Sequence, residues 1–229
     1  MQRTLFIVVA AVAVILAGVL FFALRPKPTV SLNDAAQGAR FVFGPADAKV
    51  TVVDFSNYLC PHCRDHALEV LPVIKKEYID TGKIRYVFRD FPFTGQDSVI
   101  RAGEAAACAA DANLFFEYHE ALFRSQAQWA NLSGDALDQF FADVAGQLGM
   151  APATMLECLK SGKKQAGVLA DRDMAAKLGL DSTPTFIVNG VKFSGSRGAD
   201  SLNGWRKMLD DALAGKPVQP PQDGVSSQQ

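Results

Sequence analysis

Two cysteines separated by two residues, Cys60 and Cys63, are the side chains of this sequence best suited to chemistry. Thiols at this spacing can close a disulfide, reopen it by exchange with another thiol, or bind a soft metal ion. The pair follows the mostly apolar run VVDF, at a point where a strand is expected to give way to a helix. Its chemistry therefore depends on how this junction changes the acidity of the first thiol.

The junction favours the thiolate form of Cys60. Unpaired N–H groups at the start of a helix and the positive end of its dipole stabilise an anion. Pro61 suits the first helical position, where no N–H is needed, and His62 adds a group that can be cationic or donate a hydrogen bond. These features predict a Cys60 pKa below that of a free thiol, and hence a disulfide that oxidises other thiols.

The segments around the pair predict an α/β domain. KVTVVDF, from Lys49, is an apolar, β-branched run typical of a strand buried on both faces, and residues 60–78 carry apolar positions at helical spacing. Pro72 is expected to kink that helix. KIRYVFRDF, from Lys83, is the second strand, so the first unit is a strand, helix and strand with a parallel crossover.

A helical insert and a hairpin follow. Residues 97–178 show helical patterns separated only by short polar or glycine-containing breaks. Strand patterns return in TPTFIVNGVKF, where NG indicates a hairpin, and a last amphipathic helix is expected over residues 200–214. The predicted order is βαβ, helical insert, ββα.

The first residues of the chain predict a membrane segment. Residues 5–24 are 20 uncharged and mostly apolar residues, long enough to cross a bilayer as a helix, and no clean cleavage site follows them. We expect a transmembrane anchor or signal in residues 1–24, with the anchor favoured, a linker in 25–40, the domain in 41–214 and a flexible tail in 215–229. By the positive-inside rule, the positive charges that flank this segment weakly favour a cytoplasmic position for the domain that follows it.

The charge composition argues against one class of partner. The formal net charge is −1, with 23 basic and 24 acidic residues interspersed along the chain. Nucleic-acid binding is not expected, because no concentration of basic residues marks a surface for it.

The motif and its context resemble the DsbA family of thioredoxin-fold thiol–disulfide oxidoreductases. The resemblance rests on FSNYLCPHC after a strand, on the helical insert and on STPTF before the hairpin, and it covers roughly residues 41–214. It implies a thioredoxin fold with an inserted helical subdomain, disulfide donation or exchange through Cys60 and Cys63, and no cofactor.

The resemblance also implies roles for residues outside the CPHC motif. Pro184 matches the family's cis-proline, which lies beside the active-site disulfide, and we expect Thr183 and Pro184 to bind an extended substrate peptide. Thr183 replaces the valine of the best-known oxidases, which leaves oxidase, reductase and isomerase preferences open. Asp54 matches a buried acid with the implied role of relaying the proton of Cys63; an exposed edge position is the alternative.

Cys108 and Cys158 lie 50 positions apart on two predicted helices. Two unrelated buried thiols are one interpretation. Proteins that handle disulfides outside the cytoplasm rarely keep spare thiols, and relatives in the family resembled often carry a structural bridge in the insert. We therefore expect a structural disulfide between them.

The expected partners are reduced proteins with cysteine thiols and a membrane redox partner that reoxidises the dithiol. An oxidising pair works where disulfides persist. We therefore expect the domain on the extracytoplasmic, periplasmic face of a bacterial inner or plasma membrane, held in the lipid bilayer by the N-terminal helix, or secreted if that segment is cleaved.

Other functions fit part of the motif. A copper-binding or metallochaperone protein would use the cysteine pair with His62 or His66, and a peptide-binding module would use the fold without exchange. No metal site is the favoured prediction, because no second CxxC or histidine pair follows. His66 and His119 are predicted to be solvated helix residues.

Overall fold

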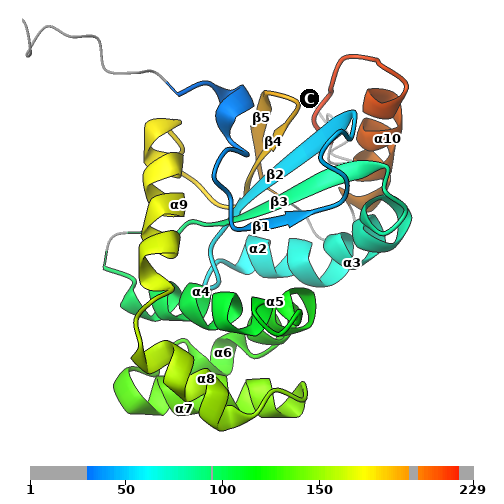
Figure 1. The fold of residues 1–229 in the computed structure, drawn as a ribbon. Helices are drawn as coiled ribbons and strands as arrows, with labels where there is room; N and C mark the ends of the chain where they lie inside the picture. The colour runs from blue at the N-terminus through cyan, green and yellow to red at the C-terminus, as the bar shows by residue number, and fades with distance from the viewer. Residues whose placement is uncertain (1–29, 94, 196–200, 222–229) are drawn as a thin grey trace, which may run out of the picture. The chain divides into compact units, whose positions relative to one another are not determined.

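The computed structural model describes residues 30–93, 95–195 and 201–221, and within them the strands form one five-stranded sheet with helices on both faces (Figure 1). The strand order is β1 (Phe41–Phe43), β3 (Ile84–Asp90), β2 (Val50–Ser56), β4 (Thr185–Val188) and β5 (Val191–Ser194). β2 and β3 are parallel, and every other neighbouring pair is antiparallel. The predicted order of strands and helices is confirmed, and β1 is an addition to it.

The parallel crossover runs through one helical segment whose winding changes along its length. α2 (Pro61–Asp65) passes into the π-helical η2 (His66–Val70), then into α3 (Leu71–Ile74) and the π-helical η3 (Lys75–Ile79). Pro72 lies in the first turn of α3 and has no N–H to continue the preceding α-helical hydrogen bonds. The irregularity expected at this proline is therefore a wider π-helical turn just before it.

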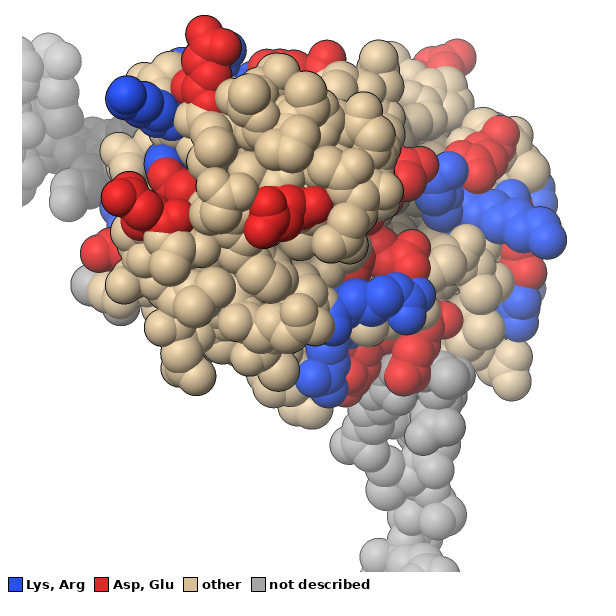
Figure 2. Space-filling model, turned by 90° about the horizontal axis from the view of Figure 1, so that it is seen from below, with Lys and Arg blue, Asp and Glu red and all other residues tan. Residues whose placement is uncertain are grey.

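The helical insert lies between β3 and β4 in the chain. It comprises α4 (Asp97–Ala110), α5 (Phe115–Arg124), α6 (Gln126–Trp129), α7 (Gly134–Gln147), α8 (Pro152–Lys160) and α9 (Gln165–Lys177). Figure 1 shows α4 to α8 gathered below the sheet and α9 rising beside it. Seen from below, acidic and basic side chains lie beside one another without a large patch of one sign (Figure 2).

The hairpin and the last helix complete the domain. Asn189 and Gly190 join β4 to β5, and both have positive φ angles, of 46° and 82°, as the NG signal requires. α10 (Leu202–Leu213) follows and buries Trp205 against Phe186 of β4, with ring centroids 4.7 Å apart. The predicted hairpin and final helix are both present.

Side-chain alternation along β2 divides the buried residues between two cores. Val50 and Val52 belong to the larger core, which includes the crossover segment, the insert and α10. Val53 and Phe55 belong to a smaller core with residues of α9. Asp54 has the same parity as Val52, so its carboxyl group faces the segment that carries the cysteines.

Residues 31–40, part of the linker that the sequence predicts for 25–40, pack on the domain. They lack an apolar period, yet Ala35 is 1% exposed. Arg40 pairs with Asp90 of β3 and with Asp171 of α9, whose carboxylate lies 2.8 Å away. Buried charge pairs, which no hydrophobic pattern reports, hold this segment on the domain.

Two predicted segments fall wholly or partly outside the described residues. These are the anchor or signal of residues 1–24 and the last part of the tail, residues 222–229. In the part of the chain that the structure describes, no helix has both the length and the apolar character needed to cross a membrane. Residues 215–221 have no regular secondary structure after the turn at Gly215, and Val218 packs on the larger core.

His66 and His119 are buried, so the prediction that both are solvated is wrong. His66 is 1% exposed and packs on Phe186 and Trp205, while His119 is 2% exposed among aromatic rings. Among the described residues, neither ring nitrogen of His66 has a hydrogen-bond partner. Burial lowers the pKa of both histidines to about 3. The helical spacing does not indicate this burial, because the crossover segment is covered on more than one side.

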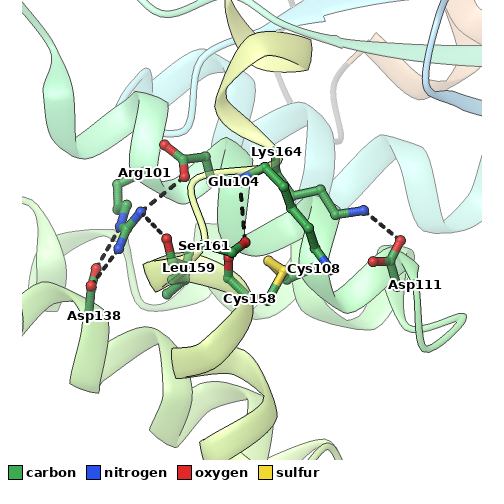
Figure 3. Close-up of a disulfide and its surroundings, with 10 residues drawn as sticks. Arg101, Glu104, Cys108, Asp111, Asp138, Cys158, Leu159, Ser161 and Lys164 are labelled. Carbon is green, nitrogen blue, oxygen red and sulfur yellow. Dashed lines mark hydrogen bonds and ion pairs between the residues drawn. A yellow bond between two sulfur atoms is a disulfide. The ribbon is translucent and has the colours of Figure 1, made fainter.

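The insert is held by a disulfide between Cys108 of α4 and Cys158 of α8 (Figure 3). Arg101 of α4 reinforces the same contact, because it donates to Asp138 of α7 and to the Leu159 carbonyl at 2.8 Å. Three helices are therefore joined by one covalent bond and one guanidinium group.

Removal of the bridge in a Cys108→Ala/Cys158→Ala variant should lower the free energy of unfolding by about 4 kcal/mol. The bridge closes a loop with a sequence separation of 50 residues and so restricts the unfolded chain. Urea unfolding of the variant and the parent protein measures the difference. Equal unfolding midpoints and slopes would contradict a stabilising bridge.

Replacement of His66 by Phe should remove part of the sensitivity to acid. In the parent protein the unfolded ring binds a proton below its ordinary pKa of 6.5, whereas the folded ring does so only near its pKa of about 3. Stability is therefore lost as pH falls from 6.5 towards 3, by up to about 1.4 kcal/mol per pH unit for one histidine. The stability of His66→Phe relative to the parent should rise by about 2 kcal/mol between pH 6.5 and 4.5. Urea unfolding at several pH values tests this, and a pH-independent difference would contradict it.

Candidate active site

The two cysteines of the CPHC motif occupy different environments at the end of β2. Cys60 caps α2 with an extended backbone, and Pro61 is the first helical residue, as the sequence predicts. Cys60 is partly exposed, whereas Cys63 is 1% exposed and belongs to the larger core. Both thiols are free in the structure. One sulfur is therefore accessible to another molecule, and the other lies beneath it.

The surroundings of Cys60 lower the pKa of its thiol to about 5. The largest cause is a hydrogen bond from the Cys63 side chain, and Thr183 and the backbone N–H groups of Cys63 and His62 add to it, while partial burial opposes them. Cys60 is consequently a thiolate at neutral pH. The His62 side chain is exposed, so its ring lies at the surface of the motif. The effect of this ring on Cys60 stays a prediction.

Cys63 has the opposite tendency. Burial raises the pKa of its thiol well above the ordinary value, and the neighbouring Cys60 and Asp54 raise it further. The Asn57 N–H lies 3.4 Å from the Cys63 sulfur and is a cause that lowers its pKa. Cys63 therefore keeps its proton and directs it to the Cys60 sulfur.

Asp54 lies beneath the pair and is 1% exposed, so the alternative of an exposed edge residue is wrong. Its Oδ1 accepts a hydrogen bond from Ser56 at 2.6 Å, and its Oδ2 accepts one from Tyr86 at 2.7 Å. Burial raises the Asp54 pKa to about 6, although both hydrogen bonds lower it. A carboxyl group that titrates near neutral pH beside a buried thiol can accept or return the proton of that thiol.

The Thr183–Pro184 peptide bond is cis and lies against the partly exposed Cys60. The carbonyl oxygen of Thr183 is 3.3 Å from the Cys60 sulfur. The carbonyl of Pro184 points elsewhere, because it accepts the Gly195 N–H at 2.9 Å. The Thr183 side of this peptide bond therefore faces the cysteine pair.

Asn57 fixes the loop before Cys60 and is a site residue that the CPHC motif does not predict. Its Oδ1 accepts the Leu59 N–H at 2.9 Å, and its Nδ2 donates to the side chain of Gln96 at 2.7 Å. The first contact is an Asx turn, and an asparagine directly after a strand is a recognisable signal for one.

Gln126 of α6 is a second such residue. Its Nε2 donates to the carbonyl oxygen of Tyr58 at 2.7 Å and to that of Cys60 at 3.3 Å. Gln126 follows Cys60 by 66 residues, and no local pattern relates the two.

The site offers little support for the soft-metal alternative. Within residues 30–93, 95–195 and 201–221, no group of three or more His, Cys, Asp or Glu side chains is placed to hold a metal ion. His66, a candidate ligand in this alternative, packs on Phe186 and Trp205. The cysteine pair is arranged for exchange between thiols.

Comparison with known proteins agrees with this chemistry. Residues 36–211 match the family model described as thioredoxin. A putative protein-disulfide oxidoreductase of Rickettsia prowazekii is 34% identical over 192 residues, which cover 83% of this chain and 66% of the relative. Disulfide bond formation protein D of Bacillus subtilis is 29% identical over 196 residues, covering 80% of this chain and 84% of the relative. The chain thus spans less than two thirds of the Rickettsia relative.

Solved structures give the same result for the fold. The oxidised form of BdbD from Bacillus subtilis has a TM-score of 0.63 and 26% identity, covering 76% of this chain and 92% of that one. Alpha-DsbA1 from Wolbachia pipientis has a TM-score of 0.66 and 25% identity, covering 84% of this chain and 95% of that one.

Asp54→Asn should slow the attack of Cys63 on a mixed disulfide at Cys60 by roughly ten-fold or more. The attack requires Cys63 to lose its proton, and Asp54 accepts that proton only when ionised. Because the Asp54 pKa is about 6, the parent rate should rise as pH increases through 6, and the variant should lack this step. Stopped-flow release of glutathione from glutathionylated Cys60 measures the rate.

Tyr86→Phe is the matched variant, because it keeps the carboxylate and removes one hydrogen bond that lowers its pKa. The midpoint of its pH profile should therefore move to higher pH. Identical profiles in the parent and both variants would exclude Asp54 from the proton transfer.

Proposed function

This chain belongs to the DsbA-like branch of the thioredoxin family, and on that premise we propose that it is a protein dithiol–disulfide oxidoreductase. The observation that carries the proposal is the asymmetry of the pair: Cys60 is accessible with a pKa near 5, and Cys63 is buried and protonated. The names of the relatives from Rickettsia and Bacillus support the same activity.

The reaction begins with a disulfide between Cys60 and Cys63. A substrate thiolate attacks the Cys60 sulfur, so that a bond forms between the two proteins while the Cys60–Cys63 bond breaks. The electron pair leaves with Cys63, which takes up a proton because its pKa is raised by burial. Asp54 lies in position to supply that proton.

A second substrate thiolate completes the exchange. It attacks the substrate sulfur of the mixed disulfide, forms the substrate's disulfide and releases Cys60 as a thiolate. Cys60 is a good leaving group because its pKa is low. Two electrons thus pass from the substrate to the cysteine pair, and stabilisation of the thiolate favours transfer in this direction.

The partners follow from this direction of transfer. The substrates are reduced proteins with cysteine thiols, bound as an extended segment beside Thr183 and Pro184. The reduced pair must then lose two electrons, and we assign this step to a membrane redox partner. The resemblance to disulfide bond formation protein D supports a role in making disulfides over breaking them.

The location is part of the proposal. We place the domain on the extracytoplasmic, periplasmic face of a bacterial inner or plasma membrane, with residues 1–24 as its anchor, or as a signal if they are cleaved. The 20 uncharged residues from Leu5 to Leu24 support a membrane segment. The Cys108–Cys158 disulfide supports an oxidising compartment, where such bonds persist.

Substrate trapping tests the roles of the two cysteines. Cys63→Ser should accumulate mixed disulfides when produced in an oxidising compartment. Its Cys60 thiolate attacks a disulfide of a substrate protein, one substrate sulfur leaves as a thiolate, and no Cys63 thiol remains to release the adduct. Cys60→Ser should trap few or none, because its remaining thiol is buried and protonated. Gel electrophoresis with and without reductant counts the adducts.

The parent protein supplies the activity control for this experiment. It should accelerate the oxidative refolding of a reduced disulfide-containing protein in glutathione buffer. Equal trapping by both cysteine variants would reject the assignment of roles, and no acceleration by the parent would reject the activity.

A further inference from the structure

The geometry points to Gln126 as a positioning residue for the redox pair: we infer that its amide holds the loop before Cys60 and thereby favours the reduced, thiolate form of the pair. The helical insert would then regulate the redox strength of the thioredoxin core through one side chain. This inference rests on the proposed thiol–disulfide exchange, which it deepens.

Gln126 is placed to act on this loop. It is 8% exposed, and its Nε2 reaches two carbonyl oxygens of the loop, at 2.7 Å for Tyr58 and 3.3 Å for Cys60. The same loop packs on the preceding helix of the insert, since the Tyr58 ring lies 5.0 Å from that of Phe123. An amide in a buried contact of this kind fixes the direction of the carbonyls that it binds.

The position of Cys60 depends on this loop. The loop turns between Asn57 and Cys60, where the Cys60 N–H donates to the Asn57 carbonyl at 2.9 Å. Asn57 holds the start of the turn, and at its end the carbonyl of Cys60 accepts the Gln126 amide as well as the Arg64 N–H of α2. The groups that stabilise the thiolate belong to α2 and to the segment before β4. The conformation of the loop therefore determines whether the Cys60 sulfur lies close enough to contact them.

The two redox forms need this restraint to different degrees. In the oxidised form, the covalent bond between the sulfurs fixes Cys60 relative to Cys63. In the reduced form, only non-covalent contacts keep the Cys60 sulfur beside its hydrogen-bond donors. Loss of the amide therefore destabilises the reduced form more than the oxidised form and makes the disulfide a weaker oxidant.

Three variants of the full chain test the inference. Gln126→Leu removes both hydrogen bonds, and Gln126→Met does the same with an unbranched side chain of similar length and no charge. Gln128→Leu is the matched control, because it makes the same change two residues later at an exposed position. If Gln126→Leu does not fold, Gln126→Met carries the test, because its flexible side chain can fill the same space.

Two readouts separate positioning from a purely structural effect. Thiolate absorbance against pH gives the Cys60 pKa, and equilibration with glutathione gives the redox equilibrium constant. Both Gln126 variants should raise the Cys60 pKa and shift the equilibrium about five-fold towards the disulfide, as expected when the carbonyl of Cys60 itself loses one hydrogen bond. Gln128→Leu should match the parent in both readouts.

The outcomes distinguish this inference from the proposed function. Folded Gln126 variants with parental pKa and equilibrium constant overturn the inference, even if their unfolding midpoints fall, and so does an equal change in Gln128→Leu. Failure of the parent to oxidise dithiols overturns the proposed function, while the pKa comparison still decides whether Gln126 positions Cys60.

Discussion

The hydrogen bond from the buried thiol of Cys63 to the sulfur of Cys60 is the contact on which the chemistry of this protein depends. It is the largest cause of the low Cys60 pKa, and it exists because burial keeps the proton on Cys63. A more exposed Cys63 would ionise more easily and compete for the same proton. The two thiols therefore differ because Cys63, one helical turn after Cys60 at the end of a buried strand, lies deeper in the protein.

The fold maintains this difference from several directions. β2 places Asp54 on the face below the cysteines, and β4 begins directly after the cis-proline whose neighbour, Thr183, contacts Cys60. The insert adds Gln126 to the loop before Cys60. Segments that lie more than 120 residues apart in the sequence thus converge on two sulfur atoms, and the rigid central strands keep them together.

A second set of buried polar groups fixes the segment that leads into the domain. Arg89 is 2% exposed and donates to Asp171 of α9 at 2.5 Å, while Arg40 pairs with Asp90 and Asp171. Gly103 of α4 allows the close approach, since an added Cβ would lie 2.9 Å from the Asp90 carboxyl carbon. Loss of one partner would leave a buried charge unpaired, so these pairs tie the segment before β1 to β3 and α9.

Local patterns in the sequence determined the elements and the reactive residues, because each depends on neighbours in the chain. The junction at Cys60, the buried strand before it and the NG turn are all legible from spacing and residue type. The tertiary structure alone decided which side chains meet. A hydrophobic period shows that one face of a helix is buried but not what covers the other face, and for this reason the prediction of a solvated His66 is wrong. Three further features depend on contacts between distant segments, which the period of a single segment does not contain. They are the packing of residues 31–40, the burial of Cys63 and the contact of Gln126 with the loop before Cys60.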